Sequence, residues 1–123
     1  MKSEIEVFFR IINTNKINDT FRIVLGTSEG ENSKNIKNLG NTEISNGFDQ
    51  NNCYSFNTSY NIDYHFETNQ YLNISVQTQS KSHDQITSVP IGSVLSCKDN
   101  TKRINLQNYD LEITIKKVSD KKT

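Results

Sequence analysis

The 123-residue sequence contains no alanine and no tryptophan, a single proline and only two cysteines. Because alanine is the strongest helix former, its absence argues against a helical fold. Two cysteines are too few for a small scaffold stapled by disulfides. Basic and acidic residues number 14 each, so no sequence-independent attraction to nucleic acid is expected. No apolar run approaches the roughly 18 residues of a membrane-spanning helix, so we expect no transmembrane segment.

The residues that are abundant favour strands. Isoleucine, valine and threonine together number 31, and β-branched side chains fit a pleated sheet. Apolar side chains alternate with polar ones in five segments, which is typical of half-buried strands. These segments are Ile5-Val7-Phe9-Ile11, Phe21-Ile23-Leu25, Tyr60-Ile62-Tyr64-Phe66, Leu72-Ile74-Val76 and Leu111-Ile113-Ile115. The first of them indicates that the chain opens with a strand rather than a signal peptide.

The pattern predicts eight strands, at 4–13, 20–27, 39–45, 56–67, 71–79, 87–95, 103–106 and 109–118. Eight short antiparallel strands fit a two-sheet sandwich, and a closed barrel is the structural alternative. Residues 86–97 fit either a short helical turn or a bent strand, and Pro90 suits a strand end. We expect one domain over 1–123, with its core at 4–118 and a basic tail at 119–123. The candidate core residues are Ile5, Val7, Phe9, Ile23, Leu25, Ile62, Tyr64, Leu72, Ile74, Val76, Ile113 and Ile115.

One stretch goes beyond composition. Residues 39–46 read LGNTEISN, residues 60–72 read YNIDYHFETNQYL, and residues 74–76 read ISV. This stretch resembles the C2 domains of the copine family, which carry a Gly-x-Thr-Glu-Val segment, an Asp-Tyr-x-Phe-Glu segment and a Gln-x-Leu pair. The residues at matching spacing are Asp63, Tyr64, Phe66, Glu67, Gln70 and Leu72. The resemblance is specific between 39 and 76 and looser over the rest of 4–118.

The resemblance implies a fold and a function. A C2 domain is an eight-stranded antiparallel sandwich whose loops at one end hold calcium and meet lipid, and in copine-type domains the first and last strands are adjacent. Copines continue into a second C2 domain and a von Willebrand A-type domain. The chain is therefore interpreted as a copine fragment or as a lone C2 protein.

The calcium positions that the resemblance implies are largely missing here. Asp19 matches the second aspartate of the first loop, but the matching positions of the third loop hold Thr78, Ser80 and Val89. Asp84 is the only acid nearby. Because calcium affinity depends on the number of carboxylates, we expect Asp19 and Asp84 to form at most a weak, non-functional site. The alternatives are an ordinary turn aspartate for Asp19 and a solvated loop acid for Asp84.

Basic residues cluster in two places, with Lys98, Lys102 and Arg103 in the first and Lys116, Lys117, Lys121 and Lys122 in the second. Since calcium-independent C2 domains often meet anionic lipid through lysines, the candidate lipid-binding residues are Lys98, Lys102, Arg103, Lys116 and Lys117. A membrane surface contributes about 1 kcal/mol per nearby lysine. The opposing observation is that segment 56–67 is neutral to acidic, and a solvated face is an equal alternative for the lysines.

No catalytic constellation, phosphate loop or metal spacing is evident, so we expect no enzymatic activity and no cofactor beyond weakly bound calcium. The favoured interpretation is a cytoplasmic C2 module that attaches peripherally to anionic phospholipid membranes, with weak or lost calcium dependence. The alternative is a protein-interaction or scaffolding module that kept the sandwich without binding lipid or calcium. Nucleic acid is not an expected partner.

Overall fold

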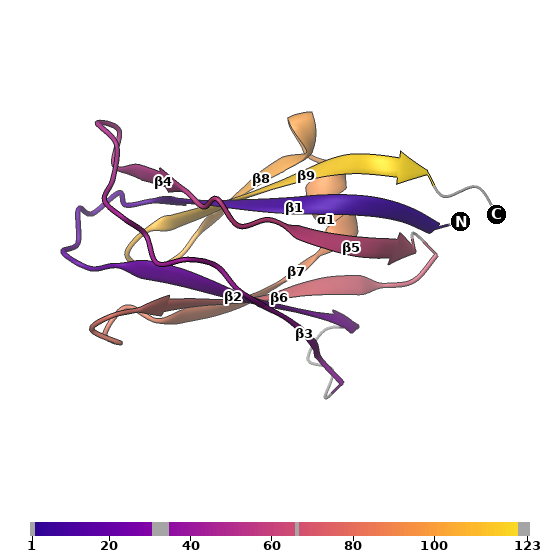
Figure 1. Cartoon of the computed structure of the whole chain (residues 1–123), viewed down its shortest axis with the longest axis horizontal. Coiled ribbons are helices and arrows are strands. Elements are labelled where there is room, and N and C mark those ends of the chain that lie inside the picture. Colours follow the sequence, from indigo (N-terminus) through magenta and orange to yellow (C-terminus); the bar gives the residue numbers. More distant parts are fainter. Residues whose placement is uncertain (1, 31–34, 66, 121–123) are drawn as a thin grey trace.

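The computed structural model describes residues 2–30, 35–65 and 67–120, and nine strands in this part of the chain form two antiparallel sheets packed face to face (Figure 1). The all-β sandwich predicted from the sequence is therefore confirmed. Phe66 and the end of the predicted tail, 121–123, lie outside the described residues. The elements are β1 (Lys2–Ile12), β2 (Phe21–Glu29), β3 (Lys37–Asn41), β4 (Cys53–Ser55), β5 (Tyr60–His65), β6 (Gln70–Thr78), β7 (Gln85–Pro90), α1 (Ile91–Leu95), η1 (Lys98–Asn100), β8 (Thr101–Asn105) and β9 (Asp110–Asp120).

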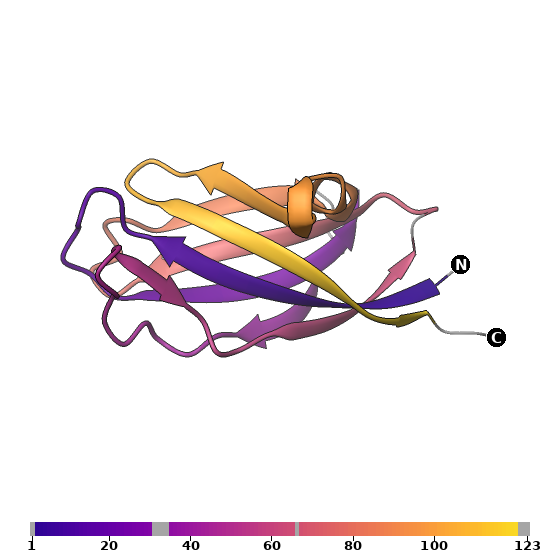
Figure 2. The same ribbon diagram turned by 90° about the horizontal axis from the view of Figure 1, so that it is seen from above.

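We call the two layers sheet A and sheet B. Sheet A has the order β4-β1-β9-β8, with β5 also paired to β1, and sheet B has the order β3-β2-β6-β7. Strands β1 and β9 pair antiparallel, with Val7 opposite Ile115 and Phe9 opposite Ile113. The prediction that the first and last strands are adjacent is therefore confirmed. Figure 2 shows the two layers from above, with α1 at the side where β7 passes to β8.

The core lies between the sheets and is built from the period-two apolar positions. All candidate core residues are buried except Tyr64, which is half-buried and packs against the cluster. Tyr109 was not among the candidates, yet its side chain is fully buried, and its ring lies edge-on to Phe21 with 4.9 Å between centroids. Truncation of such a buried aromatic side chain typically costs about 3–5 kcal/mol.

The described residues form nine strands, one more than predicted, because the short strand β4 was not expected, and the predicted strand 56–67 begins only at Tyr60. Strands β4 and β5 both pair with β1, but the chain leaves that ladder between them. The backbone N–H groups of Asn57 and Thr58 donate to the Glu43 carboxylate at 2.7 and 3.1 Å instead of to a neighbouring strand. A side chain from another segment thus separates β4 from β5, and the predicted strand 56–67 began four residues too early.

Two further strand predictions ended too late. Strand β3 stops at Asn41, because the hydroxyls of Thr42 and Ser45, rather than backbone carbonyls, accept from the N–H groups of Ile23 and Phe21 on β2. Of the two alternatives for 86–97, the structure shows a strand that ends at Pro90 followed by helix α1, so the predicted strand 87–95 is wrong beyond Pro90. Helix α1 buries Ile91 and Val94, which are three residues apart and so share a helix face.

The sandwich has two distinct ends. The connections 13–20, 79–84 and 106–109 lie together at one end, which we call the loop end (left in Figure 1). The opposite end holds the beginning of β1 and the end of β9, and we call it the terminal end. The described helices are far too short to cross a bilayer, and none qualifies as a membrane span.

Candidate functional site

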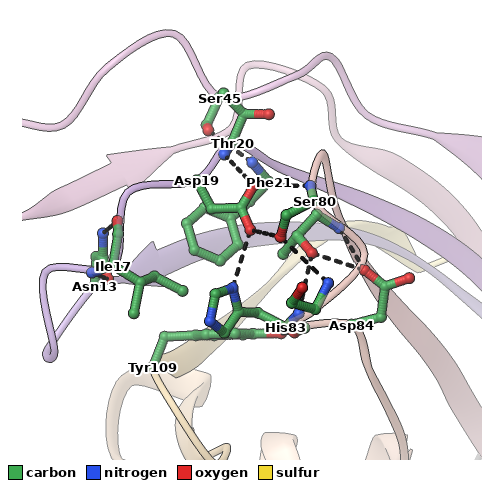
Figure 3. Close-up of polar contacts among 12 residues, drawn as sticks. Asn13, Ile17, Asp19, Thr20, Phe21, Ser45, Ser80, His83, Asp84 and Tyr109 are labelled. Atoms are coloured by element: carbon green, nitrogen blue, oxygen red, sulfur yellow. Dashed lines mark hydrogen bonds and ion pairs between the residues drawn. The ribbon is translucent and has the colours of Figure 1, made fainter.

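At the loop end, the Asp19 carboxylate lies at the centre of a hydrogen-bonded cluster (Figure 3). Its Oδ1 accepts from the backbone N–H groups of Thr20 at 3.0 Å and Ser80 at 3.2 Å. Its Oδ2 accepts from the Ser80 hydroxyl at 2.5 Å and lies 3.0 Å from Nδ1 of His83. These contacts join loop 13–20 to loop 79–84, which are far apart in sequence.

The surroundings of Asp19 keep it ionised. Its side chain is 2% exposed. Burial acts to raise its pKa, but the hydrogen bonds from Ser80, His83 and Thr20 outweigh that effect and lower the pKa to about 2. Four contacts occupy the two carboxylate oxygens, so protein donors stand where a cation would have to bind.

Asp84 does not join this cluster. Its Oδ1 accepts from the backbone N–H and the hydroxyl of Thr78 at 2.7 and 2.8 Å, which makes it a local loop brace. The two predicted calcium positions thus hold loop 79–84 separately, Asp19 from loop 13–20 and Asp84 through Thr78. Among the described residues, no three His, Cys, Asp or Glu side chains are grouped so that they could hold a metal ion.

Tyr109 supports the same loop from below (Figure 3). Its hydroxyl donates to the backbone carbonyl of His83 at 2.7 Å. Burial raises the pKa of Tyr109, and the charges of Asp84 and Asp19 raise it further, so the phenol stays protonated and remains a donor.

Ser80, His83 and Asp19 are the residue types of a hydrolytic triad, but their order of contacts is wrong for one. In a triad the imidazole lies between the carboxylate and the serine, so that it can remove the serine proton. Here the Ser80 hydroxyl and the His83 Nδ1 contact the same oxygen of Asp19. The Ser80 hydroxyl therefore donates its proton to the Asp19 carboxylate rather than to the imidazole. The contacts of this cluster join loops 13–20 and 79–84 and do not form a triad.

The motif residues that resemble copine C2 domains also have structural roles. Glu43 accepts from the Tyr54 hydroxyl at 2.9 Å and the Thr58 hydroxyl at 2.7 Å, in addition to the two N–H groups described above. Partial burial acts to raise its pKa, but these hydrogen bonds lower it to about 2. Gln70 bridges the end of β5, where it accepts from the N–H of His65 and donates to the carbonyl of Asp63. Sequence reasoning identified Glu43 and Gln70 only as motif positions.

The five candidate lipid-binding residues lie on η1, β8 and β9, away from Asp19. Register places Lys102 opposite Ile113 and Arg103 opposite Glu112, so these two neighbours face opposite sides of sheet A. The Arg103 guanidinium contacts the Asp110 carboxylate at 2.7 Å, and Lys116 Nζ lies 5.0 Å from the centroid of the Phe8 ring. Lys98 and Lys117 are exposed. Lys98 and Lys102 thus lie beside the middle of β9, Lys116 and Lys117 lie further toward the terminal end, and the four lysines form no uniform basic face.

The outer faces of the two sheets differ in charge. On sheet A, Arg10 pairs with Glu112 at 3.0 Å, Arg103 lies opposite Glu112, and Glu6 lies opposite Lys116. On sheet B, cross-strand pairing gives the outward rows Arg22–Gln77, Val24–Ser75–Ile86 and Asn73–Ser88, which contain no Asp or Glu. Ile86 is 81% exposed and Ile44 is 56% exposed. The outer face of sheet B is therefore poor in charge and carries exposed aliphatic side chains, which sequence periodicity did not single out.

Comparison of the chain with protein-family models finds no match, and comparison with curated proteins finds none either.

Proposed function

We propose that the chain is a non-catalytic protein-recognition module on a C2-like sandwich, that it works without calcium, and that its partner docks on the outer face of sheet B. The observation that carries the proposal is the exposure of Ile86 on a face whose outward strand rows, as described above, contain no Asp or Glu. Protein interfaces are depleted in charge at their centre, and exposed apolar patches on soluble domains commonly mark such interfaces.

The C2-like fold in this proposal is supported by the way in which the first and last strands are connected and paired. The first strand runs directly into loop 13–20 and pairs with the last strand, as the copine resemblance implies. The calcium-free part rests on Asp19, whose oxygens are occupied by Ser80, His83 and Thr20. Hydrogen bonds between the loops thus supply the bridge that calcium supplies in calcium-binding relatives of this fold.

Site-specific photo-crosslinking tests the docking face. A benzophenone amino acid placed at Ile86 is compared, in cells that produce the protein, with one placed at Asn61, which is exposed on β5 of sheet A. We expect one dominant crosslinked protein from position 86 and none of it from position 61. Equal crosslinking from both positions, or none from position 86, would contradict the proposal.

Peripheral binding to anionic phospholipid is the second candidate. It is favoured by four lysines on consecutive elements of the chain, Lys98 on η1, Lys102 on β8, and Lys116 and Lys117 on β9. At about 1 kcal/mol per lysine near an anionic surface, four would give weak and salt-sensitive attachment. Sedimentation with phosphatidylserine vesicles at low and moderate salt tests it. Pelleting that the double variant K116Q/K117Q abolishes, and K81Q at the loop end does not, would establish this function.

A further inference from the structure

We propose that a recess at the loop end of the outer face of sheet B holds one carboxylate of the partner, an Asp or Glu side chain in an extended segment with an apolar residue two positions away. This inference rests on the proposed function and specifies the chemistry of its partner. The recess has a volume of about 460 Å³, within the range of small-ligand sites. Its lining includes Arg22, Ile44, Gln77, Lys81 and Asp84.

Arg22 lacks the carboxylate partner that the other two arginines have. Arg10 contacts Glu112 at 3.0 Å and Arg103 contacts Asp110 at 2.7 Å. Arg22 instead donates from Nη2 to the neutral Oε1 of Gln77 at 2.7 Å, and within the described part of the chain neither Arg22 nor Lys81 forms an ion pair. Gln77 thus holds one edge of the guanidinium in place. A guanidinium fixed in this way retains donors that match the geometry of a carboxylate.

The charges of the recess select a monoanion. Arg22 and Lys81 contribute two positive charges, and Asp84 contributes one negative charge. Asp84 cannot readily turn away, because its Oδ1 is held by the N–H and hydroxyl of Thr78. One net positive charge balances a single carboxylate, whereas a phosphate monoester with nearly two negative charges would be left partly uncompensated beside Asp84.

The spacing of the face predicts the residue that accompanies the carboxylate. Arg22 and Val24 are two positions apart on one strand and face the same side, so they are separated by about 6.6 Å. An extended partner segment has the same spacing between its alternate side chains. With an acid against Arg22, the side chain two positions away reaches the row of Val24, Ser75 and Ile86. Ile44 provides an apolar wall at the recess itself.

The probe for this inference is the peptide acetyl-Gly-Glu-Thr-Val-Gly-amide, titrated into the ¹⁵N-labelled full chain and followed by NMR. We expect saturable shifts of the amides of Arg22, Gln77 and Lys81, with a Kd of about 1 mM or tighter. The matched peptide with Gln in place of Glu should bind about tenfold more weakly, because it loses a charge-assisted pair. Equal affinity for the two peptides, or no saturation at about 10 mM, would overturn the inference.

Variants of the chain locate the effect. R22Q should weaken binding of the Glu peptide about tenfold and K81Q about threefold, whereas K98Q, which removes an exposed lysine on η1 outside the recess, should leave it unchanged. The ¹⁵N spectra of each variant report whether the fold is kept. Tighter binding of inorganic phosphate than of the peptide, or Arg22-dependent binding of phosphatidylserine vesicles, would replace the carboxylate partner by a phosphate or a membrane. If the peptide fails while position 86 still crosslinks one protein, the docking face stands and only the carboxylate site is wrong.

Discussion

Replacement of Glu43 by Gln tests the clearest structural device in the molecule. Glu43 Oε1 accepts from the N–H and hydroxyl of Thr58, and Oε2 accepts from the N–H of Asn57 and the hydroxyl of Tyr54. In E43Q one of these oxygens becomes an NH₂ group. The Thr58 and Tyr54 hydroxyls can rotate to accept a hydrogen bond from this NH₂ group. A backbone N–H can only donate, so the N–H of Asn57 or Thr58 that faces the NH₂ group loses its acceptor.

The expected cost follows from the pKa. A carboxyl pKa lowered from its usual 4.5 to about 2 corresponds to roughly 3 kcal/mol of preference for the ionised form. Because Glu43 is partly exposed, solvent screening reduces this to about 2 kcal/mol. Since the folded pKa lies below the unfolded one, the stabilisation is fully present above pH 4.5 or so and is lost as the pH falls toward 2.

Urea denaturation of the wild type and E43Q at pH 7 and pH 2.5 measures this directly. The free energy of unfolding of E43Q should be about 2 kcal/mol lower at pH 7, and the difference should shrink below about 1 kcal/mol at pH 2.5. The control E29Q, at the exposed end of β2, should change stability by no more than about 0.5 kcal/mol at either pH. A difference between wild type and E43Q that is the same at both pH values would refute the reasoning.

The remaining predictions concern the loop end. D19N should lower the free energy of unfolding by about 1–2 kcal/mol, because it replaces an ionised acceptor of four contacts. It should also speed amide hydrogen exchange at Ser80 more than at Val76 in β6. Unchanged exchange at Ser80 would show that Asp19 does not join the loops. Y109F should cost about 1–2 kcal/mol in thermal unfolding, since the His83 carbonyl loses a buried donor, and a neutral result would mean that water replaces the phenol. Calorimetric titration of the full chain with calcium should show no saturable binding below roughly 100 µM; tighter binding would require Asp19 to release Ser80.

The sandwich was predictable because its core follows a period of two. Ile5, Val7 and Phe9 on β1 meet Ile113 and Ile115 on β9, and each of these side chains is buried as the alternation indicates. Such a pattern is local, so the alternation within a single strand is enough to identify which of its faces is buried. The pairing of the first and last strands came from the resemblance instead, since periodicity carries no information about which strands are neighbours.

The candidate site and the strand boundaries depended on contacts between distant segments. Nothing near Asn57 in the sequence indicates that its N–H binds Glu43, and that contact divides β4 from β5. The partners of Asp19 lie 61 and 64 residues away, at Ser80 and His83, so the sequence could identify a turn aspartate but not a brace between two loops. The exposure of Ile86 also required the structure, because alternation alone does not show that a strand lies at the edge of its sheet.

Crosslinking from position 86 with and without calcium tests whether a protein partner docks on sheet B independently of the cation. We expect the same partner protein to be crosslinked with equal yield in lysate supplied with calcium and in lysate treated with a calcium chelator. We expect none of this product from the Asn61 position under either condition. A yield from position 86 that appears only with calcium would contradict the claim, because recognition would then depend on a cation that Asp19 is not free to bind.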